Sequence, residues 1–234
     1  MQPRSREPNT TREPDPAGDP PPARSSAPRR TGVVIPVRAL EGAKSRLGAV
    51  LDAEERSELV ELLLRDTVRV VQAAGLDVVA VVSPDPATLA VAAEAGAERI
   101  AQRTSGLNPG LVEARDALAG RIDRLLVLPA DLPGIAPDDV AALIAAADDA
   151  ARGGRPVVAL APDRQGRGTN ALLLDPPTVI DPAFGSDSRD AHARLATAAG
   201  AAFVELPGLL DLDLDTPDDL LLVEDQRPEA LHVE

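Results

Sequence analysis

Residues 32–47 read GVVIPVRALEGAKSRL, a short apolar run, mostly β-branched, that is followed by a loop containing three cations. Similar apolar runs recur after Thr31 and alternate with Ala- and Leu-rich stretches of helical spacing. This alternation is typical of a mainly parallel sheet covered by helices. The sequence therefore predicts one α/β domain over residues 31–234, with strands buried on both faces.

The same patterns place the individual elements. Strands are expected at the apolar runs 32–36, 78–83, 99–102, 124–128, 156–160, 171–174 and 203–206. Helices are expected at 53–74, 86–95, 108–118, 137–151, 187–199 and 216–226. Ligands of such sheets bind beyond the carboxyl ends of the strands, so the loops that follow the strands are where chemistry is expected.

The first 30 residues differ from the rest of the chain. They hold eight of the 23 prolines, six arginines and four acidic residues, and they show no apolar periodicity. A segment of this composition cannot bury enough apolar surface to fold. We expect residues 1–30 to be a disordered, solvated tail outside the domain.

Composition excludes several classes of function. With no Cys, the chain has no disulfide, thiolate zinc site or cysteine nucleophile. A net charge of -14 and only two aromatic residues argue against binding nucleic acid. No apolar run approaches the roughly 20 residues that cross a bilayer, and the start lacks the apolar centre of a signal peptide. We therefore expect a cytoplasmic protein that binds neither nucleic acid nor membrane.

The loop after the first strand carries Arg38, Lys44 and Arg46, and Lys44 is the only lysine in the chain. Cationic side chains beside backbone N–H groups suit a triphosphate. The alternative is a solvated basic turn, because this loop is not a Walker-type P-loop.

Two acidic segments are candidates for metal binding. Asp131 follows the fourth strand between two prolines, and Asp211, Asp213 and Asp215 alternate with leucines near the end of the domain. Carboxylates are the ligands that Mg²⁺ prefers, and like charges on one side of an extended segment need solvent or a cation. The alternatives are a turn or N-cap role for Asp131 and a helix entrance after Asp213.

Three loops of small residues complete the candidates. Gly168-Thr169-Asn170 and Phe184-Gly185-Ser186-Asp187-Ser188 could bind an anion, and Gly106-Leu107-Asn108 could read a purine through backbone groups and the Asn108 amide. The alternatives are ordinary turns and an Asn helix cap. For His192 a solvent-facing or capped helix position is the default over a catalytic base.

Taken in order, these segments resemble the guanylyltransferase family that makes the phosphate-linked precursor of coenzyme F-420. Ala43-Lys44-Ser45-Arg46-Leu47 and the Phe-Gly-x-x-Ser segment with His192 are its more particular features, and the resemblance covers about residues 32–226. It implies a three-layer nucleotidyltransferase fold, GT-A-like and Rossmann-like, with a mostly parallel sheet and helices on both faces. It also implies transfer of GMP from GTP to phosphoenolpyruvate, with release of pyrophosphate.

The resemblance assigns roles position by position. The residues it implies are Lys44 as a catalytic cation, Arg46, Gly106 and Asn108 for the nucleotide, Asp131 and Asp213 for Mg²⁺ and catalysis, and Thr169, Gly185 and Ser188 for the phosphorylated acid. Whether Asp213 or Asp215 is the second metal ligand stays open.

Other functions remain open at this point. The acceptor is alternatively 2-phospho-L-lactate or 3-phosphoglycerate, and a nucleotidyltransferase of the molybdenum-cofactor type would use the same aspartates. From a different class, a nucleotide-binding protein without activity would keep the fold and lose the chemistry. A homodimer and docking of the next pathway transferase, which would consume the product, are also left open.

Overall fold

The computed structural model describes residues 29–40 and 44–226, and these form an α/β structure around one sheet. The expected disordered tail lies outside the described residues, except for Arg29 and Arg30. Arg29 pairs with Asp175, and Arg30 pairs with Asp123.

Seven strands form the sheet in the order β3-β2-β1-β4-β6-β5-β7. Their bounds are β1 (Thr31–Pro36), β2 (Val78–Ser83), β3 (Glu98–Ala101), β4 (Arg124–Val127), β5 (Val157–Pro162), β6 (Thr169–Asp175) and β7 (Ala202–Glu205). Neighbouring strands are parallel, except that β6 is antiparallel to both β4 and β5. The predicted mainly parallel sheet is confirmed.

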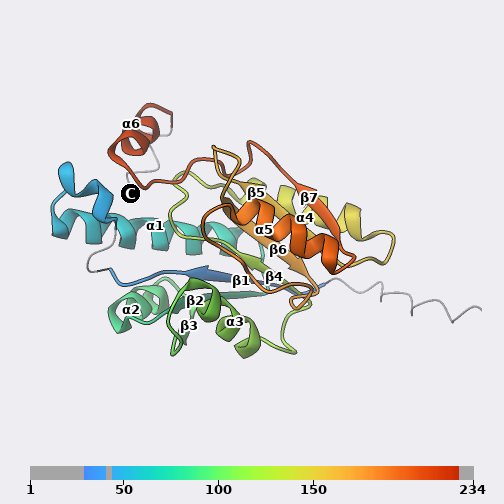
Figure 1. Ribbon diagram of the computed structural model, residues 1–234. Helices are drawn as coiled ribbons and strands as arrows, with labels where there is room; N and C mark the ends of the chain where they lie inside the picture. Colours follow the sequence, from blue (N-terminus) through green and yellow to red (C-terminus); the bar gives the residue numbers. More distant parts are fainter. Residues whose placement is uncertain (1–28, 41–43, 227–234) are drawn as a thin grey trace, which may run out of the picture.

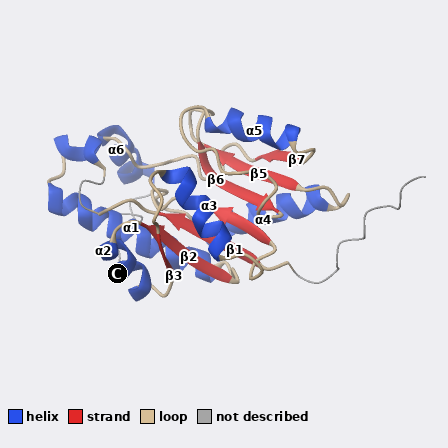
Figure 2. Cartoon of the chain, turned by 60° about the horizontal axis from the view of Figure 1, so that its bottom comes forward, coloured by secondary structure: helices blue, strands red, loops and turns tan. Residues whose placement is uncertain are grey.

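Helices cover both faces of the sheet, as Figures 1 and 2 show. Apolar contacts place α1 (Ala53–Ala73), α2 (Pro86–Glu94) and α4 (Pro137–Ala151) on one face. They place α3 (Leu107–Ala117) and α5 (Ser188–Ala198) on the other. The described residues thus form the three layers that the sequence predicts, and none of their helices is long and apolar enough to cross a membrane.

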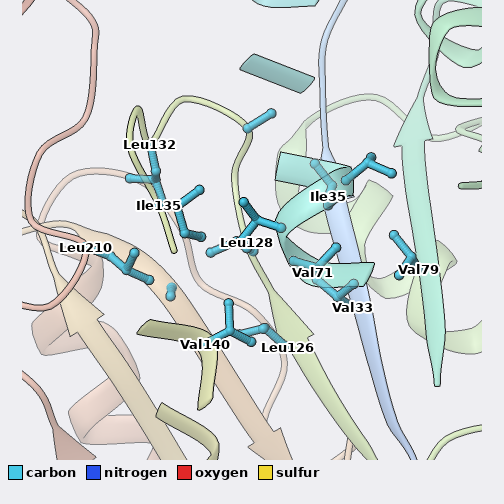
Figure 3. Packing of buried hydrophobic residues seen from close by; sticks show 14 of the residues in the cluster. Val33, Ile35, Val71, Val79, Leu126, Leu128, Leu132, Ile135, Val140 and Leu210 are labelled. Atoms are coloured by element: carbon cyan, nitrogen blue, oxygen red, sulfur yellow. The ribbon is translucent and has the colours of Figure 1, made fainter. Parts of the chain in front are cut away.

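Side chains alternate between the two layers along each central strand. In β1, Val33 and Ile35 pack under α1, and Val34 points into the opposite layer. In β4, Leu126 joins the first layer and Leu125 the second. Figure 3 shows the first of these layers, in which β-branched and leucine side chains fill the space between sheet and helices. Burial on both faces explains why these strands are apolar without interruption.

The predicted elements match the observed ones to within two residues at each end. One prediction is wrong for β3, where Glu98, Arg99 and Ala101 are exposed instead of buried. The reason is position, because β3 is an edge strand that pairs only with β2. The 3₁₀ helix η1 (Ser45–Ala49) was not predicted, and it follows Lys44, its N-cap residue, whose backbone is left-handed with φ 50°.

The topology gathers the candidate loops at one edge of the sheet. β1 and β4 are parallel, so the loops after Pro36 and Val127 leave from the same side. Because β6 is antiparallel to β4, its first residue, Thr169, lies at that same edge. A small apolar cluster next to η1 and α6 (Pro217–Gln226) buries Leu47, Leu212, Leu214 and Val223, and so fixes the acidic segment nearby.

Candidate active site

Lys44 joins the two acidic segments. Its Nζ atom donates to Oδ2 of Asp131 at 3.0 Å and to Oδ1 of Asp215 at 2.7 Å. The lysine side chain is 10% exposed, and those of Asp131 and Asp215 are 32% and 42% exposed. Burial opposes the charged form, but the two carboxylates outweigh it and raise the pKa of Lys44. Lys44 is therefore a fixed cation at neutral pH.

The acidic segment presents its carboxylates on one side, as the alternation predicts. Leu212 and Leu214 are buried, and Asp211, Asp213 and Asp215 remain partly exposed. The Leu214 N–H donates to the Asp131 backbone carbonyl at 2.9 Å. This bond holds the two acidic segments side by side, although the sequence separates them by more than 80 residues.

Asp213 carries charge that is not relieved. Burial raises the pKa of its carboxyl to about 6, and the neighbouring charges of Asp131, Asp215 and Asp219 act in the same direction. Lys44 pairs with Asp131 and Asp215 and makes no ion pair with Asp213 within the described residues. A bound cation would stabilise the ionised form of Asp213.

The residues present fit a Mg²⁺ ion that is shared with a substrate. Across residues 29–40 and 44–226, no group of three or more His, Cys, Asp or Glu side chains is arranged to hold a metal. Mg²⁺ is usually held by one or two carboxylates, with substrate phosphates and water supplying the remaining ligands. Asp131 and Asp213 provide such a pair beside the open cavity described next.

A cavity of about 560 Å³ joins the predicted site residues from both ends of the chain. Its predicted lining residues are Lys44, Arg46, Asp131, Thr169 and Asp213. Arg38 also lines it, and within the described part of the chain neither Arg38 nor Arg46 makes an ion pair. Two guanidinium groups that are unpaired among the described residues therefore line the same cavity as the carboxylates.

A second cavity of about 620 Å³ continues from the first, since both are lined by Pro36, Val37, Arg38 and Leu107. Gly106 lies here, at the start of α3. The Gln102 amide shapes the turn by donating to the carbonyls of Thr104 at 2.7 Å and Gly106 at 2.8 Å. No aromatic side chain lines this space, so a base would be recognised by backbone and polar groups.

Asn108 has a different environment from the one expected. Its Nδ2 donates to the Phe184 carbonyl at 2.9 Å, and its Oδ1 accepts from the Phe184 N–H at 2.8 Å. The amide thus ties α3 to the loop that precedes α5. Asn108 lines neither of the two joined cavities, and its contact with a nucleotide stays a prediction.

Thr169, Ser188 and His192 form a buried chain of hydrogen bonds. Ser188 Oγ lies 3.1 Å from Thr169 Oγ1, which lies 3.1 Å from His192 Nδ1. The Ala183 N–H donates to His192 Nε2 at 3.0 Å. Burial lowers the pKa of His192 to about 4, so its ring is neutral at pH 7. The default expectation of a solvent-facing or capping histidine is wrong, because the ring is fully buried.

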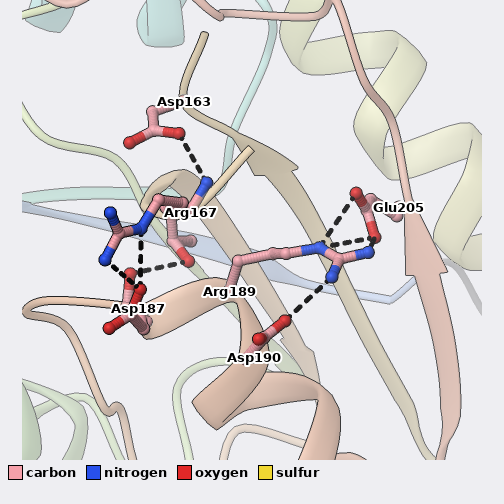
Figure 4. A network of polar contacts seen from close by, with 8 residues as sticks. Asp163, Arg167, Asp187, Arg189, Asp190 and Glu205 are labelled. Atoms are coloured by element: carbon pink, nitrogen blue, oxygen red, sulfur yellow. Dashed lines mark hydrogen bonds and ion pairs between the residues drawn. The ribbon is translucent and has the colours of Figure 1, made fainter. Parts of the chain in front are cut away.

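Gly185 lies in the loop that Asn108 and His192 hold. Its φ of 140° is in the region that favours glycine, and no atom stands near the place of a Cβ. Figure 4 shows that Arg167 bridges from the Thr169 side to this loop, with its side chain on Asp187 and its backbone N–H on Asp163. These contacts bring Thr169, Gly185 and Ser188 into one region.

Two further residues make contacts at the site that the sequence did not predict, although Asn170 belongs to the candidate Gly168-Thr169-Asn170 loop. Asn170 lines the first cavity, and its Nδ2 donates to the Leu210 carbonyl at 2.8 Å, at the start of the acidic segment. Asp219 accepts from the backbone N–H of Thr216 at 2.8 Å and from Arg164 at 3.0 Å. The Asp-Thr-Pro-Asp-Asp sequence indicates a helix entrance and so the bond between Asp219 and Thr216. Nothing in the local sequence indicates the bond between Asn170 and Leu210.

Comparison with solved structures places this fold among nucleotidyltransferases. A candidate nucleotide-diphospho-sugar transferase from Desulfovibrio desulfuricans matches with a TM-score of 0.68 and 18% identity, over 86% of this chain and 88% of that one. A cytidylyltransferase from Leptospira borgpetersenii matches with a TM-score of 0.56 and 14% identity, over 88% and 98%. At such identities the likeness concerns the fold alone.

Relatives found by sequence identify the family of this chain, beyond its fold. A phosphoenolpyruvate guanylyltransferase from Rubrobacter xylanophilus is 45% identical over 194 residues, 82% of this chain and 92% of the relative. One from Sphaerobacter thermophilus is 46% identical over 81% of this chain and 90% of the relative. The family model described as "Guanylyl transferase CofC like" matches residues 31–224. With nearly the whole described domain matched, this chain belongs to the CofC-like guanylyltransferase family.

Proposed function

We propose that this protein transfers GMP from GTP to phosphoenolpyruvate, giving enolpyruvoyl-diphospho-guanosine and pyrophosphate, as a step toward coenzyme F-420. The relatives named for this activity support the proposal. The observation that carries it is the cavity that joins Lys44, Asp131 and Asp213 to Thr169. Cationic and carboxylate side chains and the hydroxyl residue Thr169 thus line one cavity, whereas Gly185 and Ser188 do not line it themselves.

GTP is assigned to the side of the cavity with the cations. Arg38, Lys44 and Arg46 neutralise the triphosphate, and the connected cavity at Gly106 accepts the base. Nucleotidyltransferases generally use a divalent metal with the nucleoside triphosphate. Asp131 and Asp213 would hold Mg²⁺, which supplies charge neutralisation and orientation of phosphate oxygens. The finer choice of Mg²⁺ over other divalent ions belongs to this proposal.

The phosphorylated acid is assigned to the opposite side, where Thr169, Gly185 and Ser188 meet. Thr169 lines the same cavity as Lys44 and Asp131. Hydroxyl groups and the backbone of a glycine loop suit a small carboxylate or phosphate. In this proposal the acceptor phosphate faces the nucleotide across the cavity.

The reaction is an in-line displacement at the α-phosphorus of GTP. An oxygen of the acceptor phosphate forms a bond to the α-phosphorus, and the bond from that phosphorus to the bridging oxygen of the β-phosphate breaks. A phosphate monoester has a second pKa of about 6, so the acceptor is already ionised at neutral pH and needs no strong general base. The chain's own residues act by neutralising charge and by aligning the two reactants.

The remaining partners are small molecules and, we propose, the pathway transferase that consumes the guanylylated product. We propose that both enzymes act in the cytoplasm. The net charge of -14 supports the prediction that nucleic acid is not a partner.

Pyrophosphate release tests the proposed function. The protein is incubated with GTP, Mg²⁺ and, separately, phosphoenolpyruvate, 2-phospho-L-lactate or 3-phosphoglycerate, with the next transferase present to trap product. ATP and CTP serve as controls for the base. Release with GTP and phosphoenolpyruvate is expected. Release with only one of the other two acids would identify that acid as the acceptor in place of phosphoenolpyruvate. No release with any of the three acids would contradict guanylyl transfer.

A further inference from the structure

The neutral ring of the buried His192 has one N–H proton, and a backbone contact determines which ring nitrogen carries it. The Ala183 N–H donates to His192 Nε2 at 3.0 Å, so Nε2 must offer its lone pair. A neutral imidazole with an unprotonated Nε2 carries its hydrogen on Nδ1. His192 Nδ1 therefore faces Thr169 Oγ1, 3.1 Å away, as a donor.

The Nδ1–H donor of His192 determines whether the hydroxyl groups of Thr169 and Ser188 can donate a hydrogen bond to a ligand. Thr169 and Ser188 together have two hydroxyl protons, and one is used in the 3.1 Å bond between them. Because the ring already donates to Thr169, the other proton is not needed inside the chain and is available to an anion. With the hydrogen on Nε2 instead, Nδ1 would accept the second proton, and the pair would present only lone pairs.

We propose that His192 is a positioning residue that keeps one Thr169–Ser188 hydroxyl proton directed at the anionic acceptor. The inference rests on the proposed function, which assigns the acceptor to this side of the cavity. His192 does not line the cavity, whereas Thr169 does, so the histidine acts through the threonine. The ring is held in place by Phe184, at 5.3 Å between centroids in an edge-to-face arrangement.

Two substitutions separate the contacts of the ring. His192→Asn keeps an amide donor near the position of Nδ1 and loses the acceptor for Ala183. His192→Gln keeps an amide acceptor near the position of Nε2 and loses the donor to Thr169. Both remove the same ring from the same buried place, so each is the control for the other in thermal stability.

Steady-state kinetics with phosphoenolpyruvate and GTP give the readout. We expect His192→Gln to raise KM for the acid about tenfold or more, as expected for a lost hydrogen bond to a charged group. We expect His192→Asn to stay within about threefold of the unaltered protein, and KM for GTP to change little in either. An equal rise in both variants, or no rise in either, would overturn the proposal.

Nitrogen NMR of the histidine ring gives a measurement that does not depend on the folding of the two His192 variants. The chain has two histidines, so the spectrum is recorded on His232→Gln protein labelled at histidine nitrogen. We expect a protonated Nδ1 and an unprotonated Nε2 at neutral pH. The opposite tautomer overturns the inference and leaves the proposed function intact, whereas an unaltered protein that guanylylates no acid overturns both.

Discussion

The two sides of the cavity are built in opposite ways. On one side, Lys44, Asp131 and Asp213 lie on loops, are partly exposed, and carry charges that are only partly balanced. On the other, Thr169 and Ser188 are buried, and within the described residues no buried side-chain nitrogen or oxygen lacks a hydrogen-bond partner. A charged side that is incomplete by itself suits groups that rearrange around metal and triphosphate. A neutral, buried side with hydroxyl groups suits recognition of one small acid, so substitutions on the two sides should change different kinetic constants.

Removing a carboxylate from the charged side should have the largest effect. We expect Asp131→Ala and Asp213→Ala each to lower kcat by about a thousandfold or more, because the proposed metal site would lose one of its two carboxylates. Pyrophosphate release at saturating GTP and acid measures kcat, and circular dichroism checks the fold. Asp218→Asn, an exposed residue at the start of α6, is the control and should remain active. Metal-independent turnover by either alanine variant would refute the metal role.

Removing the cation of the same side should have the next largest effect. We expect Lys44→Met to lower kcat/KM for GTP by about a hundredfold, because it deletes the cation that we propose to neutralise the phosphates and leaves Asp131 and Asp215 without their ion pairs to it. Lys44→Arg should recover only part of the loss, since a planar guanidinium does not replace a compact ammonium. The control is Arg69→Met, at an exposed position of α1. Activity of Lys44→Met close to that of the control would place the triphosphate elsewhere.

Changes on the neutral side should be smaller and should appear in the acid's KM. We expect Thr169→Val to raise KM for phosphoenolpyruvate by about ten- to thirtyfold with little change in KM for GTP, because one hydrogen bond to an anion is lost. Ser188→Ala should give a smaller rise. Thr197→Val, on an exposed turn of α5, is the matched control. If Thr169→Val changes kcat and KM for GTP instead, the division between the two sides is wrong.

The smallest effect is one of stability, and its sign depends on pH. The pKa of Asp213 is about 6 in the fold against an ordinary value of 3.8, so the folded state binds this proton more tightly. The ionised carboxylate therefore destabilises the metal-free fold increasingly as pH rises from about 4 to about 6, with no further change above. Asp213→Asn removes this cost, and we expect its Tm in EDTA at pH 7 to exceed that of the unaltered protein by about 2 to 4 °C.

This stability difference should shrink as the pH approaches 4. Thermal melts at pH 4.5 and pH 7 measure it, with Asp211→Asn as the neighbouring control in the same segment. Equal melting temperatures of Asp213→Asn and the unaltered protein at pH 7 would show that Asp213 carries no such strain. A gain in stability together with lost turnover would support a carboxylate kept for metal binding at a cost in stability.

Much of the fold was predictable because each central strand is buried on both faces and therefore apolar. The direction of β6 was not, since an apolar run between two turns has no local mark of parallel or antiparallel pairing. The edge position of β3 also has no local mark in the sequence. Burial there depends on which strands lie beside it, and that is a property of the whole sheet.

The sequence indicated which residues belong to the candidate site better than it indicated the hydrogen bonds and ion pairs between them. Asp131 lies in the loop after a buried parallel strand and lines the cavity, at the edge of the sheet where ligands were expected. The pairing of Lys44 with Asp215, 171 residues away, depends on the left-handed start of η1 and has no local signal. The fixed ring of His192 likewise depends on Ala183 and Thr169 meeting across the loop. The expected disorder does not hold for Arg29 and Arg30, which make ion pairs, and for the rest of residues 1–30 it stays a prediction, as do the assigned roles of the site residues.

Following the phosphorus of GTP into product tests the central claim most directly. GTP labelled at the α-phosphorus and GTP labelled at the γ-phosphorus are incubated in parallel with the protein, phosphoenolpyruvate and Mg²⁺, and the products are separated by anion exchange. The account predicts that the α-label appears in a compound that also contains the enolpyruvoyl group, and that the γ-label appears in pyrophosphate. Transfer of the γ-label to the acid, or an α-label that remains in GTP, GDP or free GMP, would contradict it.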